Sequence, residues 1–465
     1  MPVPALLERL EALDVDAAGR SALGLVESLY PILRSITGDG VRATLAAVRE
    51  GLELNGNDAW ITHEVPSGDR ALDWELPPEW TVREAWVRGP GGDKVIDLAE
   101  HGLHLLSYSE PFRGRVSRQE LDEHLHSLPE QPDRIPYRTS YYARRWGFCL
   151  THRQRQALPE GEYEVCIDST LDEAGSLTYG ELFLPGADPR EVLLSTHVCH
   201  PQLCNDNLSG VAVLAEVAAV LAKLQRAQRR FSYRLLFVPG TIGAICWLAR
   251  NPDCSCRVAH GLLAANLGDR GGFHYTRSRR EAPIDRAVRC AFAALDQPLE
   301  IEPFSPFGYD ERQYCSPGFD LPVGSLTRTP WGRYPEYHTS GDDLDFVSAA
   351  SLGRSVQAYL AVLAALEADR SYRNLSPYGE PQLGRRGLYG SLGGASSGRE
   401  REQALLWMLN QSDGGRSLLD VAERSGIAFT DLAHAAAALE EAQLLRAGDR
   451  GPAAGAAGMA PRTHG

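Results

Sequence analysis

The sequence has too little positive charge for a protein whose main partner is nucleic acid or an anionic membrane. It contains 47 Lys and Arg against 61 Asp and Glu in 465 residues, a net charge of −14. Such an excess of acid repels phosphate backbones and anionic lipids. Amine-bearing substrates stay open. We therefore expect a small peptide or an amine-bearing metabolite as partner, with no nucleic acid and no membrane.

Long apolar runs and paired cysteine motifs are also missing. No stretch approaches the roughly 18 apolar residues of a membrane span, and the start of the chain carries acids where a secretory signal has a basic and then an apolar run. Nine cysteines, odd in number and scattered, do not form a secreted disulfide framework. The sequence predicts a cytoplasmic protein with reduced thiols and leaves a homo-oligomer open.

The pattern of apolar residues changes several times along the chain, whose length allows two to four domains at roughly 150 residues each. Residues 22–53 have helical spacing interrupted near Gly38, which predicts two short helices. From about 60 to 142, short alternating runs between Pro and Gly pairs predict a small β-rich insert. From 191 to 366, apolar strands alternate with helices, which predicts a mostly parallel, helix-covered sheet of the α/β class.

The C-terminal part differs from this sheet region. After a Gly/Ser-rich linker at 384–398, three helical patterns over 402–448 are typical of a winged helix. Seven acids outnumber four bases between 401 and 446, and the last helix offers almost no side chain that reads bases or binds phosphate. A protein-contact or dimerisation role therefore suits this module better than DNA binding. Residues 449–465 are low in complexity and predicted to be disordered.

The densest polar segment is STHVCHPQLCNDNLSG at 195–210, directly after the apolar run EVLL. His197 and His200 thus lie at the carboxyl end of a predicted parallel strand, where open α/β sheets bind their ligands. Asp206 precedes a long apolar helix, whose N-terminus favours negative charge. Imidazole with carboxylate is the ligand mix that suits Zn²⁺. The segment predicts a metal site, although a single histidine is more often a hydrogen-bonded core or surface residue.

Further candidate groups follow at other strand and loop ends. The run HGLLAANLGD ends in Asp269, and the loop GYDERQYCSPG contains Asp310 and Glu311. The segment PEYHTSGDDLDFV supplies a second polar cluster, which consists of Glu336, His338, Asp342 and Asp343. The two aspartates of that cluster also fit ordinary helix-start acids.

Two cysteines lie among these candidates. Cys199 and Cys204 form a C-x₄-C spacing without a second pair, which is weak support for a structural zinc site and more typical of packed thiols. Cys199 and His200 could also form a nucleophile pair, but adjacent side chains at a strand end diverge.

The order of these clusters resembles the zinc aminopeptidase superfamily with co-catalytic metals. The resemblance is carried by His197, by the DNLSG segment with Asp206, by the turn FVPGTIG, by Asp269 and by the HTSGDD segment with His338. More closely, segments from YPILRSITGDGVR to EPQLGRRGLYG, over roughly residues 25–447, resemble a bacterial family of aminopeptidase-like proteins. Members of that family often lie among polysaccharide or secondary-metabolite genes.

This resemblance implies three domains. Residues 1–58 and 146–370 would form a zinc peptidase-like catalytic domain, residues 59–145 an inserted β-rich domain, and residues 371–448 a C-terminal winged helix.

The resemblance also implies the metal ligands. It makes His197 a zinc ligand, Asp206 the carboxylate that bridges metals in two-zinc relatives, and His338 the last ligand. Asp269 matches the strand-end acid of the first metal less closely, and His200 can replace or join His197.

One part of the superfamily pattern is absent. Where two-zinc aminopeptidases have a Glu-Glu pair, one base and one ligand, this sequence has Pro239-Gly240-Thr241. One zinc site is therefore expected and a second is in doubt, and another carboxylate has to act as the base. Glu311 is the candidate, because the superfamily has a polar loop facing the metal there; its alternative is an ion pair with Arg312.

Other residues would contact the substrate or orient the ligands. Glu336 could fix the ring of His338 from behind or contact substrate. The expected substrate-binding residues are Asp310, Asp342 or Asp343 for an ammonium group, Glu336, and Tyr142 with Tyr141 and Trp146 as pocket walls. Packing at a domain junction is the alternative for these aromatic residues.

The implied reaction is amide hydrolysis by a zinc-dependent, aminopeptidase-like enzyme, in which zinc activates water and the carbonyl while a carboxylate carries the proton. One alternative is a zinc-dependent acyl-transfer or cyclising enzyme of secondary-metabolite or polysaccharide biosynthesis, because the Glu pair is missing. Another is a non-catalytic regulator that senses a ligand and reads DNA, which the acidity of the winged helix opposes.

Overall fold

The computed structural model describes residues 3–388 and 396–448. They form two compact units, one made of residues 13–285 and 298–359 and the other of the described parts of residues 1–12, 286–297 and 360–465. The predicted disordered tail at 449–465 and the middle of the predicted linker lie outside the described residues.

An eight-stranded sheet is the centre of the first unit. Its strand order is β1-β10-β12-β11-β13-β16-β14-β15. The central strands β12, β11, β13 and β16 are parallel to one another, whereas β1, β10 and β12 pair antiparallel, as do β16 and β14. The strands are β1 (Ala59–Pro66), β10 (Ser176–Leu184), β12 (Ser232–Val238), β11 (Glu191–His197), β13 (Val258–Ala264), β16 (Val323–Thr327), β14 (Phe273–Thr276) and β15 (Leu299–Glu302). This mixed sheet confirms the predicted α/β class.

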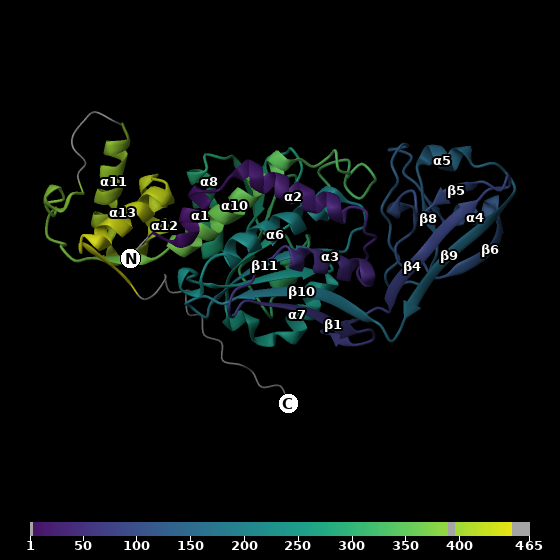
Figure 1. The fold of residues 1–465 in the computed structure, drawn as a ribbon, viewed down its shortest axis with the longest axis horizontal. Coiled ribbons are helices and arrows are strands. Elements are labelled where there is room, and N and C mark those ends of the chain that lie inside the picture. The colour runs from purple at the N-terminus through teal and green to yellow at the C-terminus, as the bar shows by residue number, and fades with distance from the viewer. Residues whose placement is uncertain (1–2, 389–395, 449–465) are drawn as a thin grey trace. The chain divides into compact units, whose positions relative to one another are not determined.

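Helices cover both faces of this sheet. Figure 1 shows α3 and α6 on one side of the strands and α7 on the other. The helices of this unit are α2 (Val15–Leu29), α3 (Asp39–Glu50), α4 (Arg118–Glu123), α5 (His152–Ala157), α6 (Ser209–Ala222), α7 (Ile242–Arg250) and α9 (Glu311–Tyr314). The helix α2 begins after Asp14, whose side chain accepts the N–H of Ala17 at 2.9 Å and caps the first turn. Every residue of β11 is buried, as is typical of a central parallel strand.

Two helical segments are long and apolar enough to span a membrane, contrary to the prediction that no stretch approaches this length. They are Cys204–Ala222 and Ala349–Ala368, which is α10, and 83% and 78% of their apolar windows are buried inside the protein. This burial is that of core helices. All nine cysteines lie within the described residues, and none of them forms a disulfide.

A smaller sheet has the strand order β5-β4-β9-β6. Its strands are β4 (Glu79–Arg88), β5 (Lys94–Asp97), β6 (Phe112–Ser117) and β9 (Glu162–Asp172), and two short pairs accompany it, β2 (Arg70–Ala71) with β3 (Trp74–Glu75) and β7 (Leu125–His126) with β8 (Phe148–Cys149). The insert predicted at 59–145 therefore has different limits. Residues 59–66 belong to the large sheet, and residues 162–172 pair with β4 and β6. Alternating hydrophobicity marks a strand but does not say which sheet it joins.

The second unit contains a winged helix. Its elements are α1 (Ala5–Glu11), β17 (Ser371–Asn374), α11 (Ser396–Gln411), β18 (Asp413–Ser417), α12 (Leu418–Ser425), α13 (Phe429–Glu441) and β19 (Leu445–Ala447), together with most of α8 (Pro283–Ala294). The strands form a sheet of order β18-β17-β19. The three C-terminal helices confirm the helical pattern seen in the sequence, and Ser417 caps α12 in a reciprocal bond pattern with Asp420.

Candidate metal centre

Three imidazoles surround one buried carboxylate at the carboxyl end of β11. Nε2 of His197 lies 2.8 Å from Oδ1 of Asp206, and Nδ1 of His200 lies 3.8 Å from the same oxygen. On the other side, Nε2 of His338 lies 3.0 Å from Oδ2 of Asp206. Asp206 is completely buried, whereas a third of the His338 side chain is exposed. The structure thus brings together residues that lie up to 141 positions apart.

Several atoms of this group lack the hydrogen bonds that buried polar atoms normally make. Nδ1 of His200, Oδ2 of Asp206 and Nε2 of His338 are buried and have no partner with hydrogen-bond geometry among the described residues. Ligand atoms of His197, His200 and Asp206 all lie within 4.8 Å of one another. Unpartnered imidazole nitrogens that converge on a carboxylate form a donor set that fits Zn²⁺.

The electrostatics agree with a cation site. Burial by itself would raise the pKa of the Asp206 carboxyl, but the imidazoles around it, His200 foremost, hold that pKa well below its ordinary value. Burial lowers the pKa of His200 to about 3, so its ring is neutral near pH 7 and keeps a free lone pair. An ionised carboxylate with a neutral imidazole is the protonation state that metal binding requires.

The loop that carries Asp206 is fixed by Asp342. Its carboxylate accepts the backbone N–H groups of Asn205 at 2.6 Å and of Asp206 at 2.8 Å. Asn207, on the other side of Asp206, donates its amide to the carbonyl of His197 at 3.0 Å. The buried guanidinium of Arg34 fixes the backbone of His200 in the same way, because it donates to the carbonyl of His200 at 2.9 Å. The candidate ligands are therefore held by backbone contacts behind them.

Tyrosines enclose the histidines. The ring of Tyr309 stacks on His197 at 4.6 Å, the ring of Tyr337 stacks on His338 at 3.9 Å, and the two hydroxyls lie 2.8 Å apart. The edge of Tyr137 meets His200 and His338 at 5.2 and 5.1 Å. These contacts restrict the orientation of each imidazole ring.

The loop of His338 is tied to the segment that returns from the smaller sheet. The N–H of Tyr137 donates to the carbonyl of His338 at 2.8 Å, and the N–H of Ser340 donates to the carbonyl of Ile135 at 2.8 Å. These two hydrogen bonds flank an isolated antiparallel β-bridge between Pro136 and Thr339. His338 itself has a φ of 54°, a left-handed backbone that a non-glycine residue adopts only where its surroundings enforce it.

Comparison with known proteins agrees with this geometry. Residues 23–369 match the family described as "Domain of unknown function (DUF4910)". The chain belongs to the DUF4910 family. Residues 370–447 match a winged helix-turn-helix family, as the sequence predicted. The predicted resemblance to an aminopeptidase-like family is confirmed by the relatives of this DUF4910 chain.

One relative, from Clostridium acetobutylicum, is 45% identical over 429 residues, or 92% of this chain and 96% of its own; its name is "Putative polysaccharide biosynthesis protein with aminopeptidase-like domain". A crystal structure of a "putative peptidase" from the same organism covers 95% of this chain and 98% of its own, with a TM-score of 0.87 and 42% identity.

Zinc aminopeptidases share the fold at low identity. BSAP, a zinc aminopeptidase from Bacillus subtilis, has a TM-score of 0.54 and 11% identity over 74% of this chain and 93% of its own. A Peptidase M28 precursor from Shewanella amazonensis has a TM-score of 0.52 and 12% identity over 78% of this chain and 95% of its own. At such identities the likeness concerns the fold of the DUF4910 chain alone.

Other predicted residues of this DUF4910 protein have different surroundings from those expected. The carboxylate of Asp269 accepts the side-chain amide of Asn205 and the hydroxyl and N–H of Thr329, so the structure does not bring it into the histidine group. Glu336 forms an ion pair with Arg134 at 2.7 Å. The structure therefore places Asp269 outside the histidine group and pairs Glu336 with an arginine, and the predicted role of Glu336 at the substrate stays a prediction.

The two acids of the 309–311 loop differ sharply. Both carboxylate oxygens of Glu311 lie 3.1 Å from the N–H of Tyr309, so this side chain folds back on its own loop. Asp310 is fully buried, and neither of its oxygens has a partner among the described residues. Burial raises the pKa of the Asp310 carboxyl to about 7, against a lowering by His197. Asp310, and not Glu311, is thus the buried carboxylate near His197 whose oxygens have no partner among the described residues.

The remaining acids and thiols have structural roles. Asp342 does not begin a helix and does not point at solvent, because both of its oxygens are taken by the Asp206 loop. Asp343 accepts the N–H groups of Asp345 and Phe346 within its own turn. Burial raises the pKa of the Cys199 thiol to about 12, and its sulfur faces the carbonyl of Gly240 at 3.8 Å. These surroundings are those of a packed thiol.

Sequence reasoning missed the tyrosines and the asparagines of this centre. Tyr309 and Tyr337 directly precede Asp310 and His338, and Asn205 and Asn207 flank Asp206. A search for polar and aromatic neighbours of each candidate ligand would have found them.

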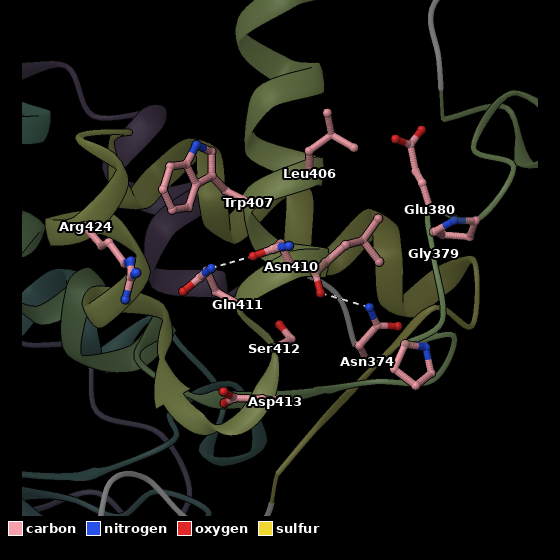
Figure 2. A pocket seen from close by; sticks show the side chains of 13 residues that line it. Asn374, Gly379, Glu380, Leu406, Trp407, Asn410, Gln411, Ser412, Asp413 and Arg424 are labelled. Atoms are coloured by element: carbon pink, nitrogen blue, oxygen red, sulfur yellow. Dashed lines mark hydrogen bonds between the residues drawn. The ribbon is translucent and has the colours of Figure 1, made fainter.

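A roomier cavity, of about 690 Å³, lies in the winged-helix unit. Figure 2 shows side chains of α11, including Leu406 and Trp407, on one wall and the segment around Glu380 on another. Its polar groups largely satisfy one another: Gln411 donates to Asn410 at 2.6 Å, and Asp413 pairs with Arg416 at 2.6 Å. The described residues that line this cavity do not bring a set of metal-binding or catalytic side chains together. The histidine group does, and some of its ligand atoms have no hydrogen-bond partner among the described residues.

Proposed function

We propose that this DUF4910 protein is a zinc-dependent amide hydrolase of aminopeptidase type that acts on a small peptide or an aminoacyl-type metabolite. The observation that carries the proposal is the convergence of three imidazoles on the buried carboxylate of Asp206, with unpartnered ligand atoms. The fold shared with zinc aminopeptidases supports it.

His197, Asp206, His338 and His200 would hold the metal. A bound Zn²⁺ supplies Lewis acidity toward a carbonyl oxygen and toward water. The chain itself orients these ligands through Asp342, Arg34 and the stacked tyrosines, and it excludes bulk water by burying Asp206 completely. A second metal stays in doubt, since Gly240 and Thr241 replace the expected Glu pair.

We assign proton transfer to Asp310, in place of Glu311. A Cβ on Gly240 would lie 3.0 Å from Cβ of His197 and 3.5 Å from Oδ1 of Asp310. A glutamate places its own carboxylate oxygens roughly 3–4 Å from its Cβ, by ordinary bond lengths. The distance from this Cβ position to Oδ1 of Asp310 is therefore about the same as the distance from the Cβ of a glutamate at position 240 to its own carboxylate oxygens. The unpartnered Oδ atoms are free to take a proton from water and to pass it to a leaving amine.

The test combines metal content with turnover. Elemental analysis of the full-length protein should find zinc, and zinc-loaded protein should cleave aminoacyl amides. His197→Ala and His338→Ala variants should lose both zinc and turnover while keeping the fold by circular dichroism. A protein that binds no zinc, or that binds it and leaves every amide and acyl acceptor unchanged, would exclude an enzyme of this type.

A second candidate function is zinc-dependent acyl transfer in polysaccharide biosynthesis. The missing Glu pair and the name of the Clostridium acetobutylicum relative favour it. Mass spectrometry of reactions that contain both an aminoacyl amide and an amino sugar would separate the two: a new amide indicates transfer, and free acid alone indicates hydrolysis.

For the winged helix we propose a protein-contact role within a cytoplasmic enzyme. His434 of α13, the helix expected to read DNA, is bonded to Glu11 of α1 at 2.7 Å. Asp420 of α12 pairs with Arg286 at 2.6 Å. Salt-dependent, nanomolar binding of duplex DNA in an anisotropy titration would contradict this role.

A further inference from the structure

The segment that returns from the smaller sheet forms a small cavity with the start of α7. Its volume is about 120 Å³, and it is lined by Ile36, Trp74, Tyr141, Tyr142, Gly240, Thr241, Ile242 and Ile245. No charged side chain lines this cavity. Ile242 and Ile245 form buried walls, whereas Trp74 and Tyr142 are 46% and 55% exposed. The cavity thus has an apolar interior and a partly open aromatic edge.

Two observations place this cavity next to the histidine group. Gly240, which lines the cavity, would place a Cβ 3.0 Å from Cβ of His197. The hydroxyl of Tyr141 is bonded to that of Tyr137 at 2.6 Å, and the ring of Tyr137 meets His200 and His338. On one side of the cavity, Gly240 separates a bound group from His197. On the other side, Tyr141 and its partner Tyr137 separate the group from His200 and His338.

The two aromatic residues at the edge lack a role in the core. The rings of Trp74 and Tyr142 are 5.5 Å apart, and both are substantially exposed although they are large and apolar. Exposed aromatic pairs at the edge of an apolar pocket are a common feature of ligand sites, because they gain contact area when the ligand covers them.

We propose that this cavity binds the branched aliphatic side chain of the substrate, of three or four carbons, as in a valyl or leucyl group. The proposal rests on the proposed amide hydrolase for the reaction that follows binding. The size agrees, since an apolar cavity of about 150 Å³ accepts benzene and this one is somewhat smaller. The absence of charge from its lining disfavours lysyl and glutamyl groups.

The first test measures binding to metal-free, full-length protein. Leucinamide should bind at least ten times more tightly than glycinamide by isothermal titration calorimetry, because each buried methylene contributes about fourfold in affinity. Trp74→Ala and Tyr142→Ala should abolish this preference, and both sites are exposed enough for the variants to fold. Tyr378→Ala, which removes a 97% exposed aromatic residue of the other unit, is the matched control and should keep it. Equal binding of the two amides to the native protein would overturn the proposal.

The second test measures turnover. With zinc present, kcat/KM should rise on the order of 100-fold from glycyl to leucyl amide and fall back in the Trp74→Ala and Tyr142→Ala variants. A preference for leucinamide in binding with no turnover would keep the cavity assignment and reject the hydrolase. Turnover that is indifferent to the side chain would keep the hydrolase and reject the cavity assignment.

Discussion

The histidine group and the winged-helix unit use their charged side chains in opposite ways. In the winged-helix unit the charges pair with one another: Glu423 with Arg289 at 2.8 Å, Asp413 with Arg416 at 2.6 Å. In the histidine group, the completely buried Asp206 faces three imidazoles and no Lys or Arg, and neither oxygen of the equally buried Asp310 has a partner among the described residues. Buried charge is costly unless something compensates it. A buried carboxylate that faces only imidazoles, or no partner among the described residues, therefore indicates a binding site, whereas a carboxylate paired with arginine at the surface indicates structure.

The largest expected effect is that of Asp206→Asn. It removes the negative charge that the three imidazoles share, so zinc binding and amide turnover should both be lost. Zinc content by elemental analysis and kcat on an aminoacyl amide are the measurements. Asp413→Asn, which removes the charge of a surface carboxylate paired with Arg416 in the other unit, should change neither. If the two variants have the same zinc content and the same kcat, the proposed difference between the histidine group and the winged-helix unit is wrong.

The next largest effect separates two neighbouring acids. Asp310→Asn should lower kcat by about 10²–10⁴-fold while zinc is retained, as expected for the loss of a proton-transfer group. Glu311→Gln should keep most of the activity, because that carboxylate accepts the N–H of Tyr309 in its own loop. A rise in KM without a fall in kcat for Asp310→Asn would make this residue an ammonium anchor. Full loss in Glu311→Gln would restore Glu311 as the base.

A smaller effect is expected for Asp342→Asn. The amide keeps one acceptor for the two N–H groups of Asn205 and Asp206, so one buried donor loses its partner at a cost of about 1–3 kcal/mol in unfolding free energy. Zinc affinity should fall by about 10–100-fold, as for other residues that hold metal ligands in place. Urea unfolding and zinc titration measure the two effects. An unchanged zinc affinity would show that the Asp206 loop needs no such support.

The smallest effect is expected for Arg286→Ala. This side chain pairs with Asp420 and Glu423, all of them partly exposed, so the loss should be about 1 kcal/mol or less. Thermal unfolding should show a small shift that shrinks at high salt, with zinc content unchanged. A large shift would mean that the winged-helix unit depends on its surface pairs more than exposed ion pairs allow.

The sequence predicted the parts of the site that follow from local position. His197 ends an apolar strand, Asp206 precedes an apolar helix, and the structure brings both to the same end of the sheet with His338. The α/β alternation likewise predicted the central parallel strands. Strand-end position is a local property, and therefore the sequence displays it directly.

The rest depends on contacts that sequence spacing does not contain. Asp342 bonds to backbone groups more than 130 residues away, which no local pattern reveals. Asp310 and Glu311 are adjacent acids, and only the direction of each side chain separates the open one from the one folded back. The limits of the β-rich insert differ from the predicted 59–145 for the same reason, because the pairing partners of β1 and β9 are set by the tertiary fold.

The β-bridge between Pro136 and Thr339 limits which changes of sequence length the insert can accept. Because the backbone of His338 is bonded to the strand-like segment 135–137, the smaller sheet and its returning chain cannot be exchanged as an independent module. A length change in that segment would displace a candidate ligand as well as Tyr137, which borders two histidines. We therefore expect relatives that alter the insert to alter the candidate metal centre with it, so that the two diverge together.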